Sequence, residues 1–296
     1  MNKLLLLLAL CLSACSKQAE VSTPPPPIAK DGLDQQKRYT SLSEAVAHAA
    51  TVYDLDLSNQ HLTQLPDSVF LLYNLRELNL RFNQLTELPA TIGNLSHLRM
   101  LSVANNNLTK LPEQIGRLHE LQFLGLWWNE LTVLPDSLWQ CQQLKELNLT
   151  SMAHLDYSQV LPQLHRLKRL KSLHLGNGPQ TSFDLSTAQM DSLEELSLIR
   201  LPRLPYATVL KKLSRLPHLT TLHLSGNRLH QLPQEIGLLK PLQKLNLYEN
   251  QLTKLPPTMR ALPNLQEITL LNNPISKREI KQLQQWLPKV TIIADE

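Results

Sequence analysis

The sequence holds one group of residues whose types and spacing could support catalysis. His174, Ser197 and His223 follow one another at intervals of 23 and 26 residues, and Glu195 lies two residues before the serine. A histidine beside a serine can activate the hydroxyl group as a nucleophile. No aspartate stands where it would orient either histidine, and a flat open surface would exclude no water. We therefore interpret the group as a solvated row of polar side chains, with catalysis as the weaker hypothesis.

The sequence also gives no evidence for a metal site or a cofactor site. The sequence has no metal-ligand spacing of cysteines and histidines and no glycine-rich phosphate loop. If the three residues lie on three consecutive strands, His174 and His223 are two strand spacings apart, ~10 Å, which is too far for the two side chains to share a metal. Cys141 falls at an apolar position and is expected to be a buried, unreactive thiol. We expect no enzymatic activity, no cofactor and no metal.

Composition narrows the class of protein. The chain has 296 residues, of which 42% are hydrophobic and only 8 are glycine. Leucine dominates the hydrophobic residues, which argues against an ordinary α/β enzyme with strands rich in valine and isoleucine. The 29 basic and 25 acidic residues give a net charge of +4. This near balance does not indicate a nucleic-acid partner.

The first residues look like a targeting signal. Lys3 precedes an apolar run from Leu4 to Leu12, which is far shorter than the ~20 residues that span a bilayer as a helix. The run ends in Leu12-Ser13-Ala14-Cys15, which resembles the lipobox of bacterial lipoproteins. The resemblance implies that residues 1–14 are a signal peptide. It also implies that Cys15 becomes the lipidated N-terminus of the mature protein.

The residues after Cys15 suggest where the protein resides. Ser16 is not aspartate, and in the enterobacterial pattern this implies sorting to the outer membrane. Four consecutive prolines, Pro24 to Pro27, favour a semi-rigid polyproline II spacer. We interpret residues 15–40 as a lipidated tether and expect a protein of the bacterial cell envelope. Inner or outer membrane, and a periplasmic or surface-facing position, both stay open.

A repeat fills the rest of the chain. Its pattern is L-x-x-L-x-L-x-x-N-x-L-x-x-L-P-x-x-I/L-x-x-L, and successive units are 23 or 26 residues long. The ten units start at Val52, Leu75, Leu98, Leu121, Leu144, Leu170, Leu193, Leu219, Leu242 and Leu265. Leucines at the fourth and sixth positions alternate with polar residues, which predicts a short strand with one buried face. Over residues 52–276 the pattern resembles the 23-residue subtype of the leucine-rich repeat family.

The resemblance implies an α/β solenoid, a horseshoe with a parallel concave sheet, convex turns and short helices. A cap helix is expected over residues 41–51, where Ser41 and Glu44 form a capping-box pattern. A C-terminal cap is expected over residues 277–296, with a helix from Ser276 to Trp286 and a last strand near residues 290–293. Residues 144–218 are irregular, because two units have 26 residues and three lack the ninth-position asparagine. The longer units predict helices over residues 157–169 and 206–215.

The strand residues at positions 3, 5 and 7, with position 8 beside them, are expected to face the concave side. Only 5% of the residues are aromatic, yet large apolar side chains gather there on three successive units. These side chains are Phe82, Met100, Phe123, Trp127 and Trp128. Exposed aromatic patches commonly mark binding sites. We expect a monomer that binds a protein partner through these residues and Tyr248. The alternative is a glycan or peptidoglycan binder that stacks Trp127, Trp128 and Tyr248 on sugar rings.

The lipid anchor can be tested directly. Cys15→Ser removes the thioether site, so this variant should accumulate as an uncleaved or soluble precursor. Fractionation after a carbonate wash checks the outcome, because several acyl chains hold a protein in a membrane stably. A variant that stays with the membranes would show that Cys15 is not the anchor.

Overall fold

The computed structural model describes residues 37–178, 183 and 190–295. The chain divides into two units, Met1–Gln36 and Lys37–Glu296, and the second contains all of the described residues. The expected signal peptide, Cys15 and most of the tether lie outside the described residues. Within those residues, no helix combines the length and the apolar character needed to cross a membrane.

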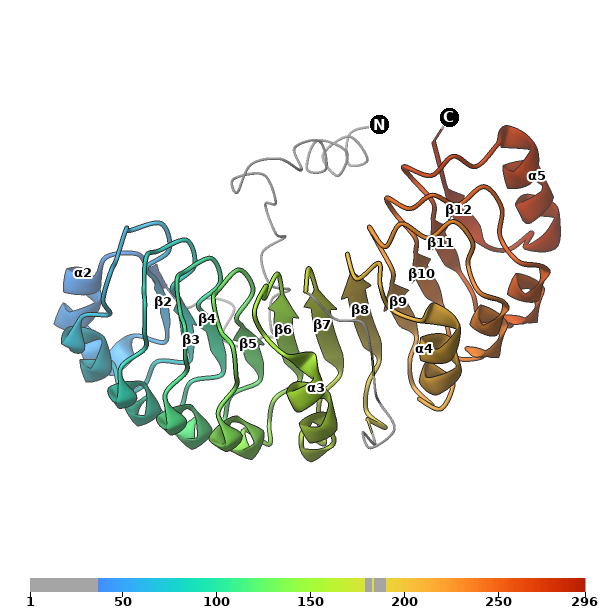
Figure 1. The fold of residues 1–296 in the computed structure, drawn as a ribbon. Coiled ribbons are helices and arrows are strands. Elements are labelled where there is room, and N and C mark those ends of the chain that lie inside the picture. Colours follow the sequence, from blue (N-terminus) through green and yellow to red (C-terminus); the bar gives the residue numbers. More distant parts are fainter. Residues whose placement is uncertain (1–36, 179–182, 184–189, 296) are drawn as a thin grey trace. The chain divides into compact units, whose positions relative to one another are not determined.

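The second unit is built on one open sheet of twelve parallel strands in sequence order (Figure 1). The strands are β1 Arg38–Tyr39, β2 Asp54–Asp56, β3 Glu77–Asn79, β4 Met100–Ser102, β5 Phe123–Gly125, β6 Glu146–Thr150, β7 Ser172–Gly176, β8 Glu195–Ile199, β9 Thr221–His223, β10 Lys244–Asn246, β11 Glu267–Thr269 and β12 Thr291–Ile293. Each of the ten repeat units contributes one strand, β2 to β11. Strand β1 lies in the range expected to be tether, and it pairs with β2.

Short helices return the chain from one strand to the next, on the side away from the sheet (Figure 1). The α-helices are α2 Leu42–Ala47, α3 Tyr157–Val160, α4 Tyr206–Leu213 and α5 Lys277–Trp286. The 3-10 helices are η1 Ala49–Thr51, η2 Asp67–Leu71, η3 Ala90–Asn94, η4 Glu113–Arg117, η5 Asp136–Gln140, η6 Leu161–Arg166, η7 Gln234–Leu238 and η8 Pro257–Ala261. A proline with extended backbone precedes most of the 3-10 helices of the 23-residue units, as Pro89 does with φ −70° and ψ 154°.

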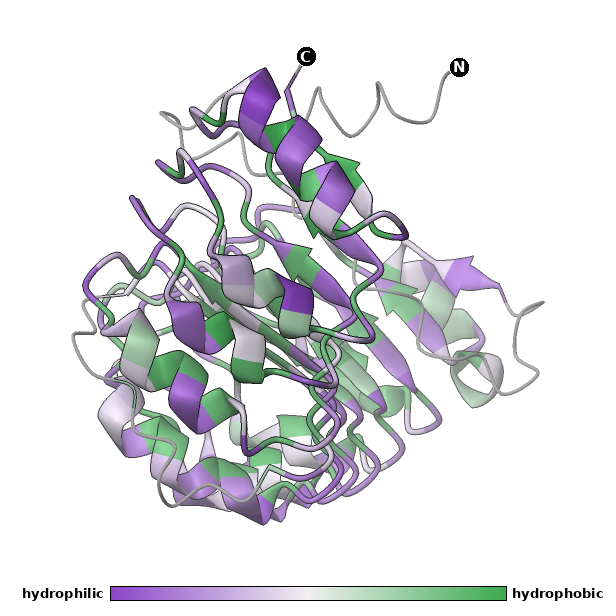
Figure 2. Ribbon diagram, turned by 90° about the vertical axis from the view of Figure 1, so that its right-hand side faces the viewer, coloured by the Kyte–Doolittle hydropathy of each residue, from purple (hydrophilic) through white to green (hydrophobic). Residues whose placement is uncertain are grey.

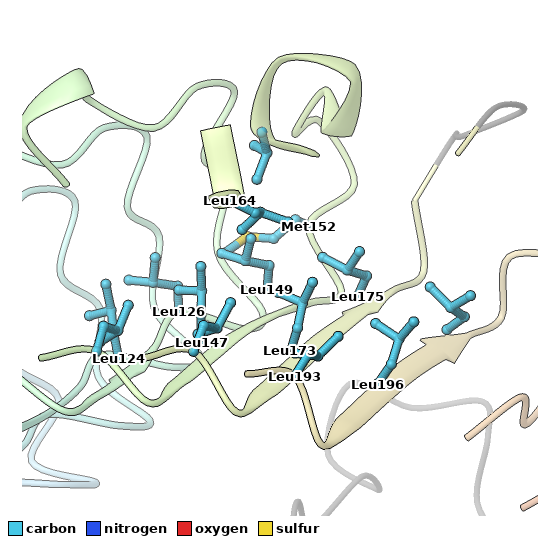
Figure 3. Packing of buried hydrophobic residues seen from close by; sticks show 14 of the residues in the cluster. Leu124, Leu126, Leu147, Leu149, Met152, Leu164, Leu173, Leu175, Leu193 and Leu196 are labelled. Carbon is cyan, nitrogen blue, oxygen red and sulfur yellow. The ribbon is translucent and has the colours of Figure 1, made fainter. Parts of the chain in front are cut away.

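Columns of leucine hold the strands together. Leu78 pairs in register with Leu101, and Leu101 with Leu124, so identical side chains stack from one unit to the next. These leucines are fully buried. Figure 3 shows the same stacking for Leu124, Leu147, Leu173 and Leu196, from β5 to β8. Each buried leucine contributes ~1.5–3 kcal/mol, but only when the neighbouring units cover it.

The expected asparagine ladder is present and joins each of the six units that carry a ninth-position asparagine to the unit before it. Asn83 Oδ1 accepts hydrogen bonds from the backbone N–H groups of Gln60 and Leu62, each at 3.0 Å. Its Nδ2 donates to the carbonyls of Leu57 and Leu80. The same pattern recurs at Asn106, Asn129, Asn227, Asn250 and Asn273.

Tyrosine hydroxyls bind backbone groups of the turn in the two 26-residue units, where Met152 and Leu201 stand in place of the ninth-position asparagine. Tyr157 Oη donates to the carbonyl of Leu149 at 2.8 Å and accepts from the N–H of Gly176 at 3.2 Å. Tyr206 Oη donates to the carbonyl of Leu201 at 3.2 Å. Burial raises the pKa of both hydroxyls, which keeps them neutral and able to donate. The sequence did not reveal this substitution.

The helices expected in the long units form, but the first is shorter than predicted. Helix α3 ends at Val160 and continues as the 3-10 helix η6 to Arg166. Pro162 explains the change, because it has no amide hydrogen for an α-helical hydrogen bond. Helix α4 covers Tyr206–Leu213, so it ends two residues before the predicted end, and it buries four of its side chains.

Both caps form in the predicted ranges, but the N-terminal cap is divided into α2 and the 3-10 helix η1 rather than being one helix. Ser41 caps α2 by accepting a hydrogen bond from the N–H of Glu44, whose carboxylate pairs with Lys37 rather than with the backbone of Ser41. Ser276 caps α5 in the same way, and β12 completes the sheet beside β11. Helix α5 is largely hydrophilic (Figure 2), and Trp286 is partly buried against the core.

The leucine register predicts a large loss of stability for a charge in a column. Leu101→Asp should lower the free energy of unfolding by at least about 3 kcal/mol, because it removes a buried side chain and buries a carboxylate. Thermal unfolding followed by circular dichroism measures the change. Thr109→Asp, at an exposed position of the same unit, is the matched control and should melt like the parent protein.

Candidate binding surface

The side chains opposite the leucine columns form the strand face, made of positions 3, 5 and 7 of each unit. The residue at position 8 follows directly and has a left-handed backbone in all ten units, with φ between 51° and 69°. These ten residues form a ridge along one edge of the strand face: Asn59, Phe82, Asn105, Trp128, Ser151, Asn177, Arg200, Gly226, Glu249 and Asn272. Nine of the ten are not glycine, so the stacked turns impose this conformation on ordinary residues.

The structure corrects the expectation that the five clustered apolar residues are all exposed. Met100, Phe123 and Trp127 are only 7%, 2% and 4% exposed. Phe82 and Trp128, on the ridge, are half-buried. The aromatic cluster, made of these five residues, thus has three side chains buried on the strand face and two on the ridge that reach solvent.

Gly125 explains how the Phe123 and Trp127 rings are buried on the strand face. A Cβ atom at this position would lie 2.4 Å from the Trp127 ring and 3.0 Å from the Phe123 ring. The two rings meet edge to face with their centroids 6.5 Å apart, a favourable geometry for aromatic pairs. The missing side chain of Gly125 leaves the space that the Trp127 ring fills.

Tyr248 does not join the aromatic cluster. It follows β10, which lies five strands from β5 in the sheet. Its hydroxyl accepts a hydrogen bond from Asn272 Nδ2 at 2.8 Å, and its ring is half-buried. The sequence placed Tyr248 on the same face, and the structure separates it from the other predicted residues along that face.

The histidines and the serine do come together, and each histidine has a carboxylate beside it. His174 Nδ1 lies 2.8 Å from Ser197 Oγ, and His174 Nε2 lies 3.6 Å from Glu146 Oε1. His223 Nε2 lies 3.1 Å from Glu195 Oε1. Sequence reasoning missed Glu146 as a partner of His174. Its diagonal position, third in one unit against fifth in the next, was the signal that could have identified it.

This arrangement lacks what acyl transfer requires. Ser197 is only 2% exposed, so a substrate carbonyl has no access to its hydroxyl. The strand N–H groups beside it are paired in the sheet and form no oxyanion hole. The hydrogen bond from His223 is the main cause that holds the pKa of Glu195 below its usual value. The group is a polar network that orders this part of the strand face.

Neither thiol nor metal chemistry emerges from the described residues. Among them, no three histidine, cysteine, aspartate or glutamate side chains are grouped so as to hold a metal ion. Cys141 is fully buried, its Sγ contacts the carbonyl of Ile115, and burial raises its pKa to about 12. It is the unreactive thiol that its apolar position predicted.

The contact between Glu195 and His223 makes stability depend on pH. Because the pKa of Glu195 is lowered from 4.5 in the folded protein, its contribution is present above that pH. It is lost as the pH falls further through the folded-state pKa. Glu195→Gln should therefore show a smaller loss of unfolding free energy than the parent protein between about pH 5 and about pH 3. Urea denaturation at each pH measures this, and Glu267→Gln, at the equivalent position of β11, should keep the parent slope.

Known proteins with the same pattern identify the family. Residues 49–208, more than half of the chain, match the model of a leucine-rich repeat region, and residues 217–275 match that of a leucine rich repeat. No curated protein sequence matches the chain. Proteins built on such repeats are generally binding scaffolds.

Two solved structures with TM-scores above 0.5 share the fold. The internalin InlF from Listeria monocytogenes is similar over 85% of this chain and 84% of its own, at 18% identity and a TM-score of 0.51. The ectodomain of the receptor kinase GASSHO1/SCHENGEN3 from Arabidopsis thaliana, solved in complex with CASPARIAN STRIP INTEGRITY FACTOR 2, has 26% identity and a TM-score of 0.51. The match covers 82% of this chain but only 29% of the receptor chain. A Leptospira interrogans LRR protein is 28% identical over 87% of this chain and 99% of its own, at a TM-score of 0.33. The chain belongs to the leucine-rich repeat family.

Proposed function

We propose that this protein is a non-enzymatic binding protein of the 23-residue repeat subtype, which recognises a protein partner through its strand face and ridge. The observation that carries the proposal is the pair of partly exposed aromatic side chains, Phe82 and Trp128. They flank Asn105 on the ridge, and Trp128 directly follows Trp127 of the buried Phe123–Trp127 pair. Aromatic groups held on a rigid frame lose little entropy on binding, and they commonly dominate interface energies.

The surroundings of this pair suit a polypeptide better than a sugar. Trp127 is buried against Gly125 and has no free ring face for a sugar to stack on. Trp128 and Tyr248 are separated by five strands, so they cannot form one stacking platform. A longer polypeptide could contact the aromatic cluster and then follow the strand face to the polar network of His174 and Glu195. The related plant ectodomain was solved with a bound protein factor, which is consistent with this mode.

We also propose that the mature protein is attached to a bacterial envelope membrane through acyl chains on Cys15. The lipobox-like sequence before Cys15 supports this, and Pro24 to Pro27 would hold the repeat unit away from the lipid. An outer-membrane position rests on Ser16 alone. The binding surface would then act as a monomer at the membrane, with no cofactor and no nucleic acid.

Truncating the ridge aromatics should weaken partner capture. In Phe82→Ala with Trp128→Ala, each lost interface aromatic is expected to cost at least ~2 kcal/mol, about thirtyfold in affinity. The immobilised full chain, solubilised in detergent, is incubated with envelope extract, and the captured proteins are compared between variants. The melting temperature should change little, because both side chains are only half-buried.

Two exposed apolar residues of the first unit provide a matched control. Leu71→Ala with Tyr73→Ala removes similar apolar area away from the strand face and should leave capture intact. If both double variants capture equally well, the proposed surface is wrong. Trp127→Ala is unsuitable for this test, because removing its buried ring would lower stability as well.

A further inference from the structure

The ridge has a gap beside its basic and acidic residues. Position 8 is Gly226 in the unit that starts at Leu219, the only one of the ten ridge residues without a side chain. Its neighbours on the ridge are Arg200 on one side and Glu249 on the other. A pocket of about 460 Å³ opens at this gap.

Arg200 and Glu249 meet across the gap. Arg200 Nη2 lies 3.2 Å from Glu249 Oε2, although the two residues are 49 positions apart in the sequence. The side chain of Arg200 lies over Gly226, where a Cβ atom would come within 2.6 Å of Arg200 Cγ. The Arg200 side chain can therefore cross the gap because position 226 has no side chain.

Polar groups complete the wall of the pocket. Asn177, Arg228 and Gln251 line it together with Arg200 and Glu249. Arg228 is exposed and has a left-handed backbone of its own, with φ 54°. Asn250 also lines the pocket, but the ladder already occupies its amide. Among the described residues, the charged lining therefore has two guanidinium groups and one carboxylate.

We infer that this ridge pocket binds a carboxylate group, presented by an acidic side chain of a partner polypeptide. Guanidinium groups bind carboxylates with paired, charge-assisted hydrogen bonds. Glu249 shows that Arg200 already accepts a carboxylate at this position. The ion pair between them is solvent-accessible, and such pairs exchange readily because water screens both charges. An incoming carboxylate can displace Glu249 from Arg200 and also reach Arg228.

The lining argues for a single carboxylate rather than a phosphate. Glu249 stays at the rim of the pocket after displacement, and its negative charge disfavours a dianion more than a monoanion. The amide of Gln251 can donate a hydrogen bond to the second carboxylate oxygen, and so can the second N–H of the Asn177 amide, whose Nδ2 also donates to Ser151 Oγ at 2.8 Å. Because the pocket opens at the edge of the strand face, a polypeptide lying on that face can place an acidic side chain in it.

The test uses the full chain in detergent and two capped peptides, acetyl-Gly-Glu-Gly-amide and its glutamine analogue. Nuclear magnetic resonance follows the Gly226 amide and the Nε–H groups of Arg200 and Arg228. The glutamate peptide should shift these resonances and the glutamine peptide should not. Arg228→Gln should weaken binding about tenfold, as expected for the loss of a charge-assisted pair.

Glu249→Gln provides the sharper result, because it removes the internal competitor. This variant should bind the glutamate peptide several-fold more tightly than the parent protein, whereas a purely structural ion pair predicts no gain. Arg278→Gln, a matched loss of an exposed arginine on helix α5, away from the strand face and ridge, should leave binding unchanged.

Three results would overturn the inference. They are the absence of any shift at Gly226, equal shifts with both peptides, and a Glu249→Gln variant that gains no affinity. Butyrate, a monoanion, serves as a free carboxylate. Binding of butyrate as tight as that of the peptide would reject a partner side chain in favour of a small-molecule site. Because these probes do not contact Phe82 or Trp128, failure here is independent of the capture test.

Discussion

The stacked asparagine amides are the interaction on which the array depends. Each amide satisfies the turn of the preceding unit and the end of its own strand, so neither turn is complete alone. A buried backbone group left without a partner costs ~1–3 kcal/mol. Asn129, for example, accepts from Leu108 and donates to Val103 and Leu126. The units consequently stabilise one another, and the leucine columns close only because the turns are held in register.

The turn that these amides close also creates the ridge, and it keeps its shape in the units that start at Leu144, Leu170 and Leu193, which lack the asparagine. Holding the turn fixes the eighth residue of each unit in the left-handed region, at a cost of ~1–2 kcal/mol for a residue with a Cβ atom. The frame bears this cost at Phe82, Trp128, Arg200 and Glu249 alike. Side-chain identity on the ridge is therefore separate from the interactions that maintain the fold. Binding groups can change there without disturbing the leucines beneath them.

The repeat register was readable from the sequence because every unit carries the same physical requirement. Leu101 must be buried and Asn106 must close a turn, whatever surrounds them, and both lie as predicted. The burial of Trp127 was not readable. It depends on Gly125 on the same strand, and no single-position rule reports that a ring will fold over a neighbour.

The other misses have the same origin. The pairing of Glu146 with His174 needs two strands and a diagonal contact, and the sequence pattern gives only rows. The role of Tyr157 depends on a helix that brings its hydroxyl back to the end of β6, five residues after the missing asparagine. Interactions repeated in every unit can be predicted from the period of the sequence. Interactions that occur only once can be recognised only in the three-dimensional structure.

The irregular units give the strand face two ends of different character. Where Tyr157 and Tyr206 replace the asparagine, the units have room for 26 residues and for α-helices on the return side. Before this region the strand face carries the Phe123–Trp127 rings and an ion-pair group of Arg38, Asp54, Asp56 and Glu77. Within and after it the strand face carries histidines, glutamates and Tyr248, and the ridge carries the Arg200–Glu249 pair. A partner that contacted only one end would leave the groups at the other end uncovered.

An extended polypeptide with an apolar segment and an acidic residue farther along would match both ends. Because the strands are ~4.8 Å apart, the distance between Trp128 and Gly226, four units away, is about 20 Å. Six or seven residues of extended chain cover that span.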